Sequence, residues 1–425
     1  MLINVNKLRV FLFSLIILFA PFQDTILSKL PTGILTANLA FLPLLILCLL
    51  SLGKIKKLFI NPVIFYYLVF FYSINIISVL YYNYYADFEI GFMLYKMVSM
   101  SILYFLYFFL AFITYDFLKN KDLRDKLKLL IFISLVITLA GALLNIMFPS
   151  IFYSNLFHAG VQNDLSRPRG FALEPSMLGY DALAIYLLFV TLTKSKNILW
   201  NIPIILIAVI VRSKGGILII GVSYIMLQIV EICSSKILVV KNLIKIVLGL
   251  LILPVILFGF YSILLNSLLT DIEKFSSLAT RSITFAVGVR SLMFPWGQGF
   301  SGFYPFFLGS AITISGYIQS IVPLNLKLTE IFSMVDNVSS IGTKTLLWDG
   351  TIIFGVPFFY LYIRYGILIC KKFIKDNNLY CLLLAMITFL SGATFTSFVG
   401  YSYVSAICLG YLFYEYKKED INCST

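Results

Sequence analysis

Two arginines, Arg167 and Arg169, stand directly before an apolar segment that begins at Pro175. Proline suits the first turn of a helix, and a helix N-terminus presents free N–H groups and the positive end of the helix dipole. Guanidinium groups beside such an end can bind a phosphate or pyrophosphate through paired hydrogen bonds. We predict that both arginines bind such a ligand; the alternative is that they contact lipid headgroups.

Two carboxylates follow in the same region. Glu174 and Asp181 are about two helical turns apart, so the spacing predicts that both project from one face of the helix. Glu174 is near the helix start and could accept a proton from a sugar hydroxyl. Asp181 is deeper in an apolar segment, where an ionisable group is costly and is usually functional or paired. The alternative is that both only balance the nearby arginines.

A second pair of cations, Arg212 and Lys214, precedes two glycines in the run Arg-Ser-Lys-Gly-Gly, between two apolar segments. Glycines let the backbone approach a ligand closely. This run is a candidate ligand site, or simply a tight turn.

A third pair, Arg281 and Arg290, falls within the segment 276–294. If this segment is helical, positions nine apart point to opposite faces at 100° per residue, so a single site would use one of the two arginines, and we favour Arg281. The run Phe294-Pro-Trp-Gly-Gln-Gly-Phe-Ser-Gly-Phe303 follows, and its glycines suggest backbone packed against a partner or a ligand.

Other chemistries have little support. The one histidine, His158, is more typical of an incidental loop residue than of a base, and the pairs Asp87/Glu89 and Asp271/Glu273 are weak signals for a metal. The sequence has no P-loop, no GxGxxG opening a helix and no GxSxG. We expect no cofactor and no metal.

The elements that hold these residues are predicted from composition. The chain has 425 residues, of which 60% are hydrophobic and 12% charged, against about 25% charged in an average soluble domain. An aromatic content of 16% argues against disorder. We therefore predict an all-α polytopic membrane protein that forms a single domain over residues 1–425. About twelve spans are expected, at 10–22, 33–52, 62–82, 93–118, 129–148, 175–193, 197–211, 216–232, 244–264, 347–369, 379–392 and 400–415.

The net charge of +13 predicts the orientation of the chain. Most basic residues cluster just beyond the ends of apolar runs, which is typical of topology-setting charge and not of a nucleic-acid-binding face. With both termini in the cytoplasm, every inner connection is basic. Two long loops, 149–174 and 266–346, then lie outside. The tyrosines at 81, 82, 84 and 85 fall at an outer boundary, where they form an aromatic belt or stack on sugars.

In this order, the Arg167-x-x-Gly-Phe stretch, the Arg212–Gly216 turn and Arg281 with the later Pro-Trp-Gly-Gln-Gly run resemble motifs of the O-antigen polymerase and ligase superfamily. The chain is most similar to the Wzy-type polymerases of O-antigen or capsule repeat units. The stretch from Asn337 to Lys344 has no histidine, unlike the corresponding His-Asn pair of the ligases, which favours a polymerase over a ligase.

This resemblance implies a GT-C-like fold and metal-independent, inverting glycosyl transfer at the periplasmic face of the bacterial inner membrane. The donor and acceptor would be glycans on undecaprenyl pyrophosphate, with membrane lipid, a chain-length regulator and a flippase as further partners. Arg167, Arg169 and Arg281, with Arg290 as a weaker candidate, would stabilise the departing pyrophosphate. Lys214 or Arg212 would hold the second lipid pyrophosphate. Glu174 would be the base, with Asp181 as its partner.

Other classes remain as alternatives. A lipid-linked oligosaccharide flippase or other transporter also has about twelve spans, but transporters usually place charge near the bilayer midplane and show internal repeats. A non-catalytic membrane scaffold would leave the outer arginines unexplained.

Overall fold

The computed structural model describes most of the chain, in these segments: residues 5–29, 37–53, 62–153, 158, 168–194, 198–211, 221, 276–321, 331–332, 345–376, 378–394 and 403–422. Arg167, Arg212 and Lys214 lie outside the described residues, as does the predicted span 244–264 and, apart from Gly221, the span 216–232.

Over the described residues the protein is all-helical and without strands, which confirms the predicted secondary-structure class. The helices are α1 (Val5–Phe19), α2 (Phe41–Leu50), α4 (Pro62–Ala86), α5 (Ile90–Leu118), α6 (Lys121–Met147), α7 (Pro149–Tyr153), α8 (Pro175–Thr193), α9 (Asn201–Val211), α12 (Ser276–Ser291), α13 (Gly299–Ile321), α15 (Leu346–Phe354), α16 (Val356–Lys375), α17 (Leu379–Thr394) and α18 (Val404–Asn422). Two short 3-10 turns, Ile26–Lys29 and Ile198–Trp200, complete the set.

Local signals set several helix starts. The Asn120 side chain accepts a hydrogen bond from the Asp122 backbone N–H at 2.9 Å and so caps α6. Helix α8 begins with Pro175 in its first turn, as predicted. At α15 the Thr345 hydroxyl accepts a hydrogen bond from the Trp348 backbone N–H.

Two of the described helices, α5 and α6, are long and apolar enough to cross a membrane. Their mean hydropathies are 2.0 and 2.6, yet only 50% and 39% of the residues in these apolar windows are buried inside the protein. Large side chains such as Leu129 and Met147 are 60% and 67% exposed. An apolar surface of this extent is typical of contact with a membrane or a partner.

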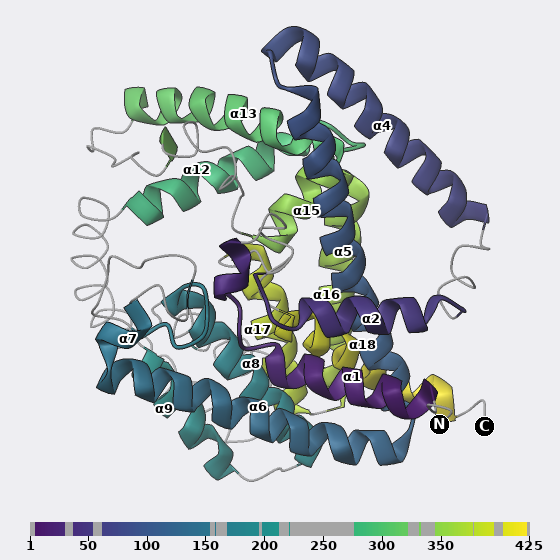
Figure 1. Ribbon diagram of the computed structural model, residues 1–425, viewed down its shortest axis with the longest axis vertical. Helices are drawn as coiled ribbons and strands as arrows, with labels where there is room; N and C mark the ends of the chain where they lie inside the picture. The colour runs from purple at the N-terminus through teal and green to yellow at the C-terminus, as the bar shows by residue number, and fades with distance from the viewer. Residues whose placement is uncertain are drawn as a thin grey trace, which may run out of the picture.

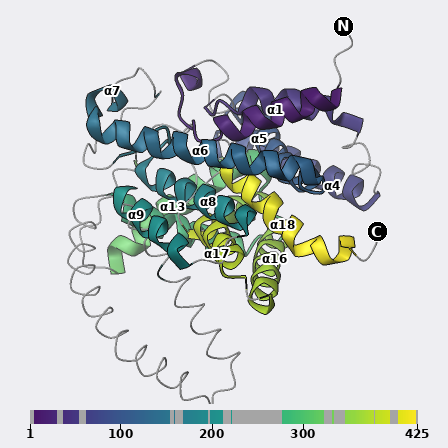
Figure 2. The same cartoon turned by 90° about the horizontal axis from the view of Figure 1, so that it is seen from below.

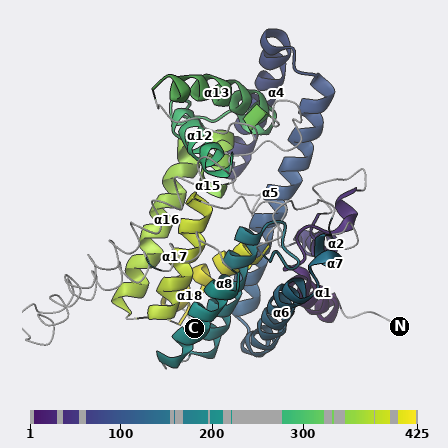
Figure 3. The ribbon, with the colours of Figure 1, turned by 90° about the vertical axis from the view of Figure 1, so that its left-hand side faces the viewer.

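The helices pack in a bundle around α5, α8, α17 and α18. Helix α5 lies along α18, and α6 lies between α1 and α8 (Figures 1 and 2). Helices α12 and α13 lie at one end of the molecule, and α1 and α6 lie at the opposite end (Figures 1 and 3).

Helix α13 is fixed to the bundle by an aromatic cluster and by one asparagine. The Phe300 ring packs 5.3 Å from that of Phe71 and 5.6 Å from that of Tyr104. The side-chain oxygen of Asn75 in α4 accepts hydrogen bonds from the backbone N–H groups of Phe300 at 2.7 Å and Ser301 at 3.2 Å. These contacts satisfy donors at the start of α13, which have no partner within the helix.

The predicted single span 347–369 is wrong in one respect, because two helices, α15 and α16, meet there at Gly355. Gly355 has φ +78°, and the backbone before and after it bonds to the glycine-rich run that precedes α13. The N–H of Gln298 donates to Ile352 O at 2.7 Å, and that of Val356 donates to Pro295 O at 3.0 Å. The glycine-rich run therefore packs against the protein's own backbone.

Candidate functional site

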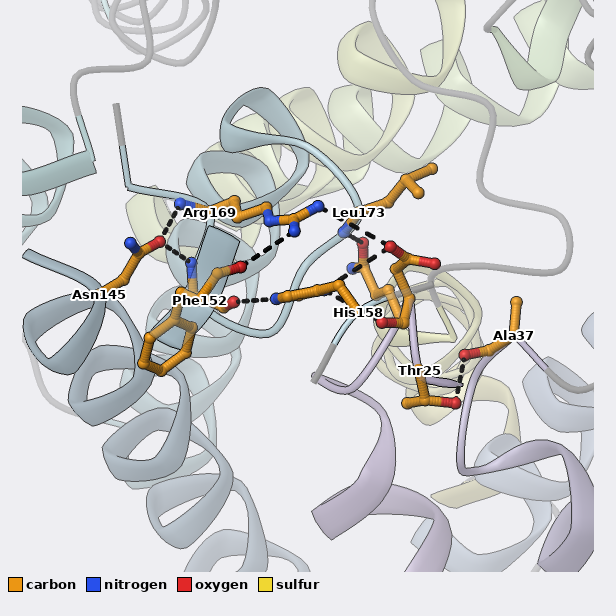
Figure 4. A network of polar contacts seen from close by, with 10 residues as sticks. Thr25, Ala37, Asn145, Phe152, His158, Arg169 and Leu173 are labelled. Carbon is orange, nitrogen blue, oxygen red and sulfur yellow. Dashed lines mark hydrogen bonds and ion pairs between the residues drawn. The ribbon is translucent and has the colours of Figure 1, made fainter. Parts of the chain in front are cut away.

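The side chain of Arg169 lies inside the protein, 2% exposed, just before α8. Its Nη2 donates a hydrogen bond to the backbone oxygen of Phe152 in α7 at 3.0 Å, and its Nη1 lies 3.8 Å from Asp24 Oδ2 (Figure 4). These contacts join the segment before α8 to α7 and to the segment after α1.

His158 completes the anchor between Asp24 and the turn at Gly170. Its Nδ1 lies 3.0 Å from the backbone oxygen of Asp24 and 3.6 Å from Asp24 Oδ2. Its Nε2 lies 2.9 Å from the backbone oxygen of Gly170, and the imidazole is 1% exposed (Figure 4). The sequence had suggested an incidental loop residue, whereas the structure gives His158 a structural place in a buried network.

Asn145, at the C-terminal end of α6, holds the backbone of the same turn. Its Oδ1 accepts hydrogen bonds from the N–H groups of Arg169 at 2.8 Å and Gly170 at 3.0 Å. Gly170 has φ +53°, and a Cβ there would lie 3.2 Å from the backbone nitrogen of Ala142. Glycine is therefore favoured at this turn both by backbone conformation and by the tight space.

A second buried pair, Gln23 and Asp181, joins the segment after α1 to α8. Gln23 donates from Nε2 to Asp181 Oδ2, and its Oε1 accepts a hydrogen bond from the Leu173 N–H at 3.3 Å. Gln23 and Asp181 are 0% and 3% exposed. The structure pairs Asp181 with Gln23, which follows α1, and this bond stabilises a polar group within an apolar helix. Its predicted partnership with Glu174 stays a prediction.

Apolar packing surrounds these polar contacts. The Phe171 ring lies 4.5 Å from that of Phe22, and Gly141 in α6 approaches the same ring so closely that a Cβ would lie 2.6 Å from it. The Gln23 N–H also donates to Phe171 O at 3.0 Å. The segment 168–174 is therefore held by the residues that follow α1 and by α6, α7 and α8.

Glu174 is the N-cap residue of α8, with φ −136° and ψ 154°, and its side chain does not cap the helix. Because its backbone is extended, helical spacing does not set the direction of its side chain relative to Asp181. The carboxylate is half-buried at the helix start. Its predicted role as a base stays a prediction.

The third predicted cation pair lies on α12, at the end of the molecule remote from the termini (Figure 3). Helix α12 spans Ser276–Ser291, so the condition on which the opposite placement of the two arginines depends is met. Arg281 is half-buried and Arg290 is exposed, as their opposite faces require. The structure does not bring these two arginines together, and their binding of pyrophosphate stays a prediction.

The contacts described above fix residues 168–174 at the N-terminus of α8. The charges of Arg169 and Asp24 are buried beneath this segment. The backbone N–H groups of a helix start favour anions. Over the described residues, no group of three or more His, Cys, Asp and Glu side chains could hold a metal ion.

Three residues behind Arg169 are not among those that the sequence indicates as functional, namely Gln23, Asp24 and Asn145. The signal for two of them was present, because a Gln-Asp pair that directly follows an apolar run at an expected outer end has charge to satisfy. Asn145 stands near the end of another apolar run and carries no such local signal.

The comparisons with known proteins place the chain in a family. No family model matches the sequence, and no solved structure matches it. The chain is similar to a Klebsiella pneumoniae protein described as "Uncharacterized 49.5 kDa protein in cps region", with 32% identity over 432 residues that cover 96% of this chain and 94% of the relative. At this identity and coverage, the chain belongs to the same protein family as that cps-region protein.

Proposed function

We propose that this protein is a membrane-bound glycosyltransferase that polymerises undecaprenyl-pyrophosphate-linked oligosaccharide repeat units into a capsular polysaccharide or O antigen. The observation that carries the proposal is the buried anchoring of residues 168–174 through Arg169, Asp24 and Asn145. A segment held in this way at a helix N-terminus can present a fixed binding surface to a phosphorylated lipid, as catalysis by electrostatic stabilisation requires.

The relative supports the product class. The description of this Klebsiella pneumoniae protein places it in a cps region, a term used for capsular polysaccharide genes. Because the two chains align over nearly their whole lengths, the proposal assigns this protein to capsule biosynthesis, or to the synthesis of a related surface polysaccharide.

The apolar helices support a lipid-linked substrate. Helices α5 and α6 are long enough to cross a bilayer and expose much apolar surface. In the proposed orientation both termini are cytoplasmic. Residues 168–174, which Arg169 anchors, and α12 face the periplasm. The polyprenyl tails then lie among the helices in the inner membrane, and no nucleotide sugar or metal is needed.

In the proposed step, an acceptor hydroxyl oxygen forms a bond to the anomeric carbon of the donor. The bond between that carbon and the pyrophosphate oxygen breaks, undecaprenyl pyrophosphate leaves with the electron pair, and the configuration inverts. Glu174 accepts the hydroxyl proton. Asp181, buried against Gln23, supports the helix start from which Glu174 acts.

In the proposal, the arginines have different roles. The guanidinium of Arg169 faces Asp24 and Phe152 O, so in the proposal it positions the segment, and Arg167, bonded to Pro168 in the sequence, contacts the leaving pyrophosphate. Arg281 stabilises the same charge from α12, while Arg212 and Lys214 bind the second lipid pyrophosphate. Loss of one such contact to the developing charge is expected to cost on the order of 10²-fold or more in rate.

The test is the polysaccharide pattern of cells whose native gene is replaced by an Arg167→Ala variant. On a gel, polysaccharide chains with different numbers of repeat units form a ladder of bands. When the variant is as abundant in the membrane as the wild type, we expect glycans of a single repeat unit in place of this ladder. Arg167→Lys is expected to fail as well, because an ammonium does not make the paired hydrogen bonds of a guanidinium.

The matched control is Lys375→Ala, which removes an exposed cation in the last turn of α16. It should leave the ladder unchanged. A normal ladder with Arg167→Ala would overturn the polymerase proposal. Complete loss of surface glycan, including single repeats, would instead indicate a flippase.

A further inference from the structure

Helix α5 buries a lysine near its N-terminal end. Lys96 is 8% exposed. Its Nζ lies 5.4 Å from the centroid of the Phe92 ring and 4.9 Å from that of Tyr304 in α13. No ion pair or hydrogen bond joins Nζ to any other residue that the structure describes. Lys96 is therefore a buried cation held by two aromatic rings.

Such a position is costly for an ammonium group. Lysine has three N–H donors, and a charge removed from water is stabilised only by a partner of opposite charge or by hydrogen bonds. Cation–π contacts offset part of this cost, but the faces of Phe92 and Tyr304 accept no conventional hydrogen bond. The site is thus suited to an anion that reaches Nζ between α5 and α13.

The depth of Lys96 limits what that anion can be. Lys96 is about two turns from the start of α5 at Ile90. Its neighbours on the outer face of the helix, Tyr95 and Val98, are 47% and 53% exposed and apolar in character. An anion at this level of an apolar helix must bring its own apolar tail, as a lipid phosphate does at the boundary between headgroups and acyl chains.

A second polar group at the interface between α5 and α13 also supports a ligand there. The Tyr104 hydroxyl is buried and has no hydrogen-bond partner among the described residues. The Tyr104 ring packs 5.6 Å from Phe300, in the first turn of α13. The face of α5 beneath α13 therefore presents two polar groups that other described residues do not satisfy.

We propose that Lys96 binds the phosphate group of a phosphate-bearing lipid between α5 and α13, at a site separate from the segment anchored by Arg169. This inference rests on the membrane location in the proposed function, but it does not depend on glycosyl transfer. The polyprenyl phosphate of a lipid-linked glycan and the headgroup of a membrane phospholipid share the required chemistry.

The experiment measures lipid binding to the delipidated full-length protein in detergent by native mass spectrometry. The probes are undecaprenyl phosphate, phosphatidylglycerol and inorganic phosphate. Lys96→Met should raise the apparent Kd for undecaprenyl phosphate about tenfold or more, the effect of losing a hydrogen bond to a charged group. Lys96→Arg, which keeps the charge, should retain more of the affinity, and Lys371→Met, at an exposed lysine of α16, should have no effect.

The probes identify the source of the phosphate. An equal loss for phosphatidylglycerol supports a general lipid-phosphate site, and a loss confined to undecaprenyl phosphate supports a site for the polyprenyl substrate. An unchanged Kd in Lys96→Met for both lipids would overturn the inference, as would inorganic phosphate binding as tightly as the lipids.

A stability measurement keeps the test meaningful if binding is lost through misfolding. Replacing an uncompensated buried charge by an apolar side chain of similar volume is stabilising. The Tm of delipidated Lys96→Met should therefore be equal to or above that of the wild type, and a clearly lower Tm would overturn the inference. If Arg167→Ala keeps its ladder while Lys96→Met loses lipid affinity, the polymerase proposal fails and the lipid site stands.

Discussion

The carboxylate of Asp24 and the guanidinium of Arg169 form a buried ion pair, with Oδ2 and Nη1 3.8 Å apart and side chains 5% and 2% exposed. The pair joins the segment that follows α1 to the segment that precedes α8. Both elements flank the helix start on which the proposed function depends, so the ion pair links the packing of the N-terminal helices to the geometry of the site.

Removing the Asp24 carboxylate should destabilise the protein strongly. In Asp24→Ala, the Arg169 guanidinium stays buried without its counter-charge, and breaking a buried pair from one side costs about 3–5 kcal/mol. We expect a clear fall in the Tm of the purified protein and reduced abundance in the membrane. Thermal unfolding followed by size-exclusion chromatography measures both.

The double variant Asp24→Leu with Arg169→Met tests whether the loss comes from the charge left behind. It should recover much of the Tm, because neither partner of this ion pair is then left buried without the other. Asp376→Ala, at the exposed C-cap of α16, is the matched control and should have little effect. Equal Tm values for Asp24→Ala and the wild type would show that the pair does not hold the segment.

Gly355 should not tolerate a side chain. Its φ is +78°, and a Cβ would lie 2.2 Å from the backbone oxygen of Pro295 and 2.6 Å from the backbone nitrogen of Gly297. Gly355→Ala must therefore separate the α15–α16 junction from the run before α13. We expect a large drop in Tm, beyond the roughly 1 kcal/mol typical of a helix glycine substitution.

The control is Gly309→Ala in the interior of α13, where nothing lies within 4 Å of the added Cβ. Alanine favours a helix over glycine by about 0.5–1 kcal/mol, so this variant should match or exceed the wild-type Tm. If the two variants behave alike, the close approach at Gly355 is not what fixes the junction.

The same junction shows what the sequence can and cannot predict about the fold. Apolar runs correctly predict α5, α6 and α8, including the start of α8 at Pro175, because helix formation depends on local composition and capping. The break at Gly355 depends on hydrogen bonds from a distant run, Pro295 to Gln298, which periodicity does not reveal. A local signal existed, since glycine at 355 is followed by proline at 357, a pairing typical of a helix end and a new start.

For the candidate site, too, local features are predictable from the sequence and long-range contacts are not. The local pattern around Arg169 and Glu174 correctly places them at a helix start. The partners Asp24 and Asn145 come from other parts of the chain, and no rule of spacing pairs them with Arg169. Whether a charged residue points outward to a ligand or inward to a partner depends on such tertiary contacts.

Asn75 should matter for the placement of α13. Its side-chain oxygen accepts hydrogen bonds from the N–H groups of Phe300 and Ser301, and its Nδ2 donates to Phe71 O at 2.9 Å. Asn75→Ala leaves the N–H groups of Phe300 and Ser301 buried without this acceptor, at a cost of about 1–3 kcal/mol. The expected result is a lower Tm. Ser73→Ala, an exposed neighbour in the same helix, should leave the Tm unchanged and serves as the control.

The two arginines of α12 should differ in function, because the helix presents them on opposite faces. A Cβ on Gly288 would lie 2.5 Å from the Trp348 ring, so the face of Gly288 packs against α15. Arg281 is two turns earlier, within about 20° of that inward face, whereas Arg290 is about 160° from it.

Under the proposed function, Arg281→Ala should therefore reduce polymerisation on the order of 10²-fold and leave mainly single repeats, while Arg290→Ala should keep a ladder of normal length. The measurement is gel analysis of cell-surface polysaccharide at matched membrane abundance of each variant. Arg281→Lys distinguishes a requirement for charge from a requirement for the paired hydrogen bonds of a guanidinium. A normal ladder with Arg281→Ala, or its loss with Arg290→Ala, would contradict the assignment, because only the inward face of α12 is directed at the rest of the protein.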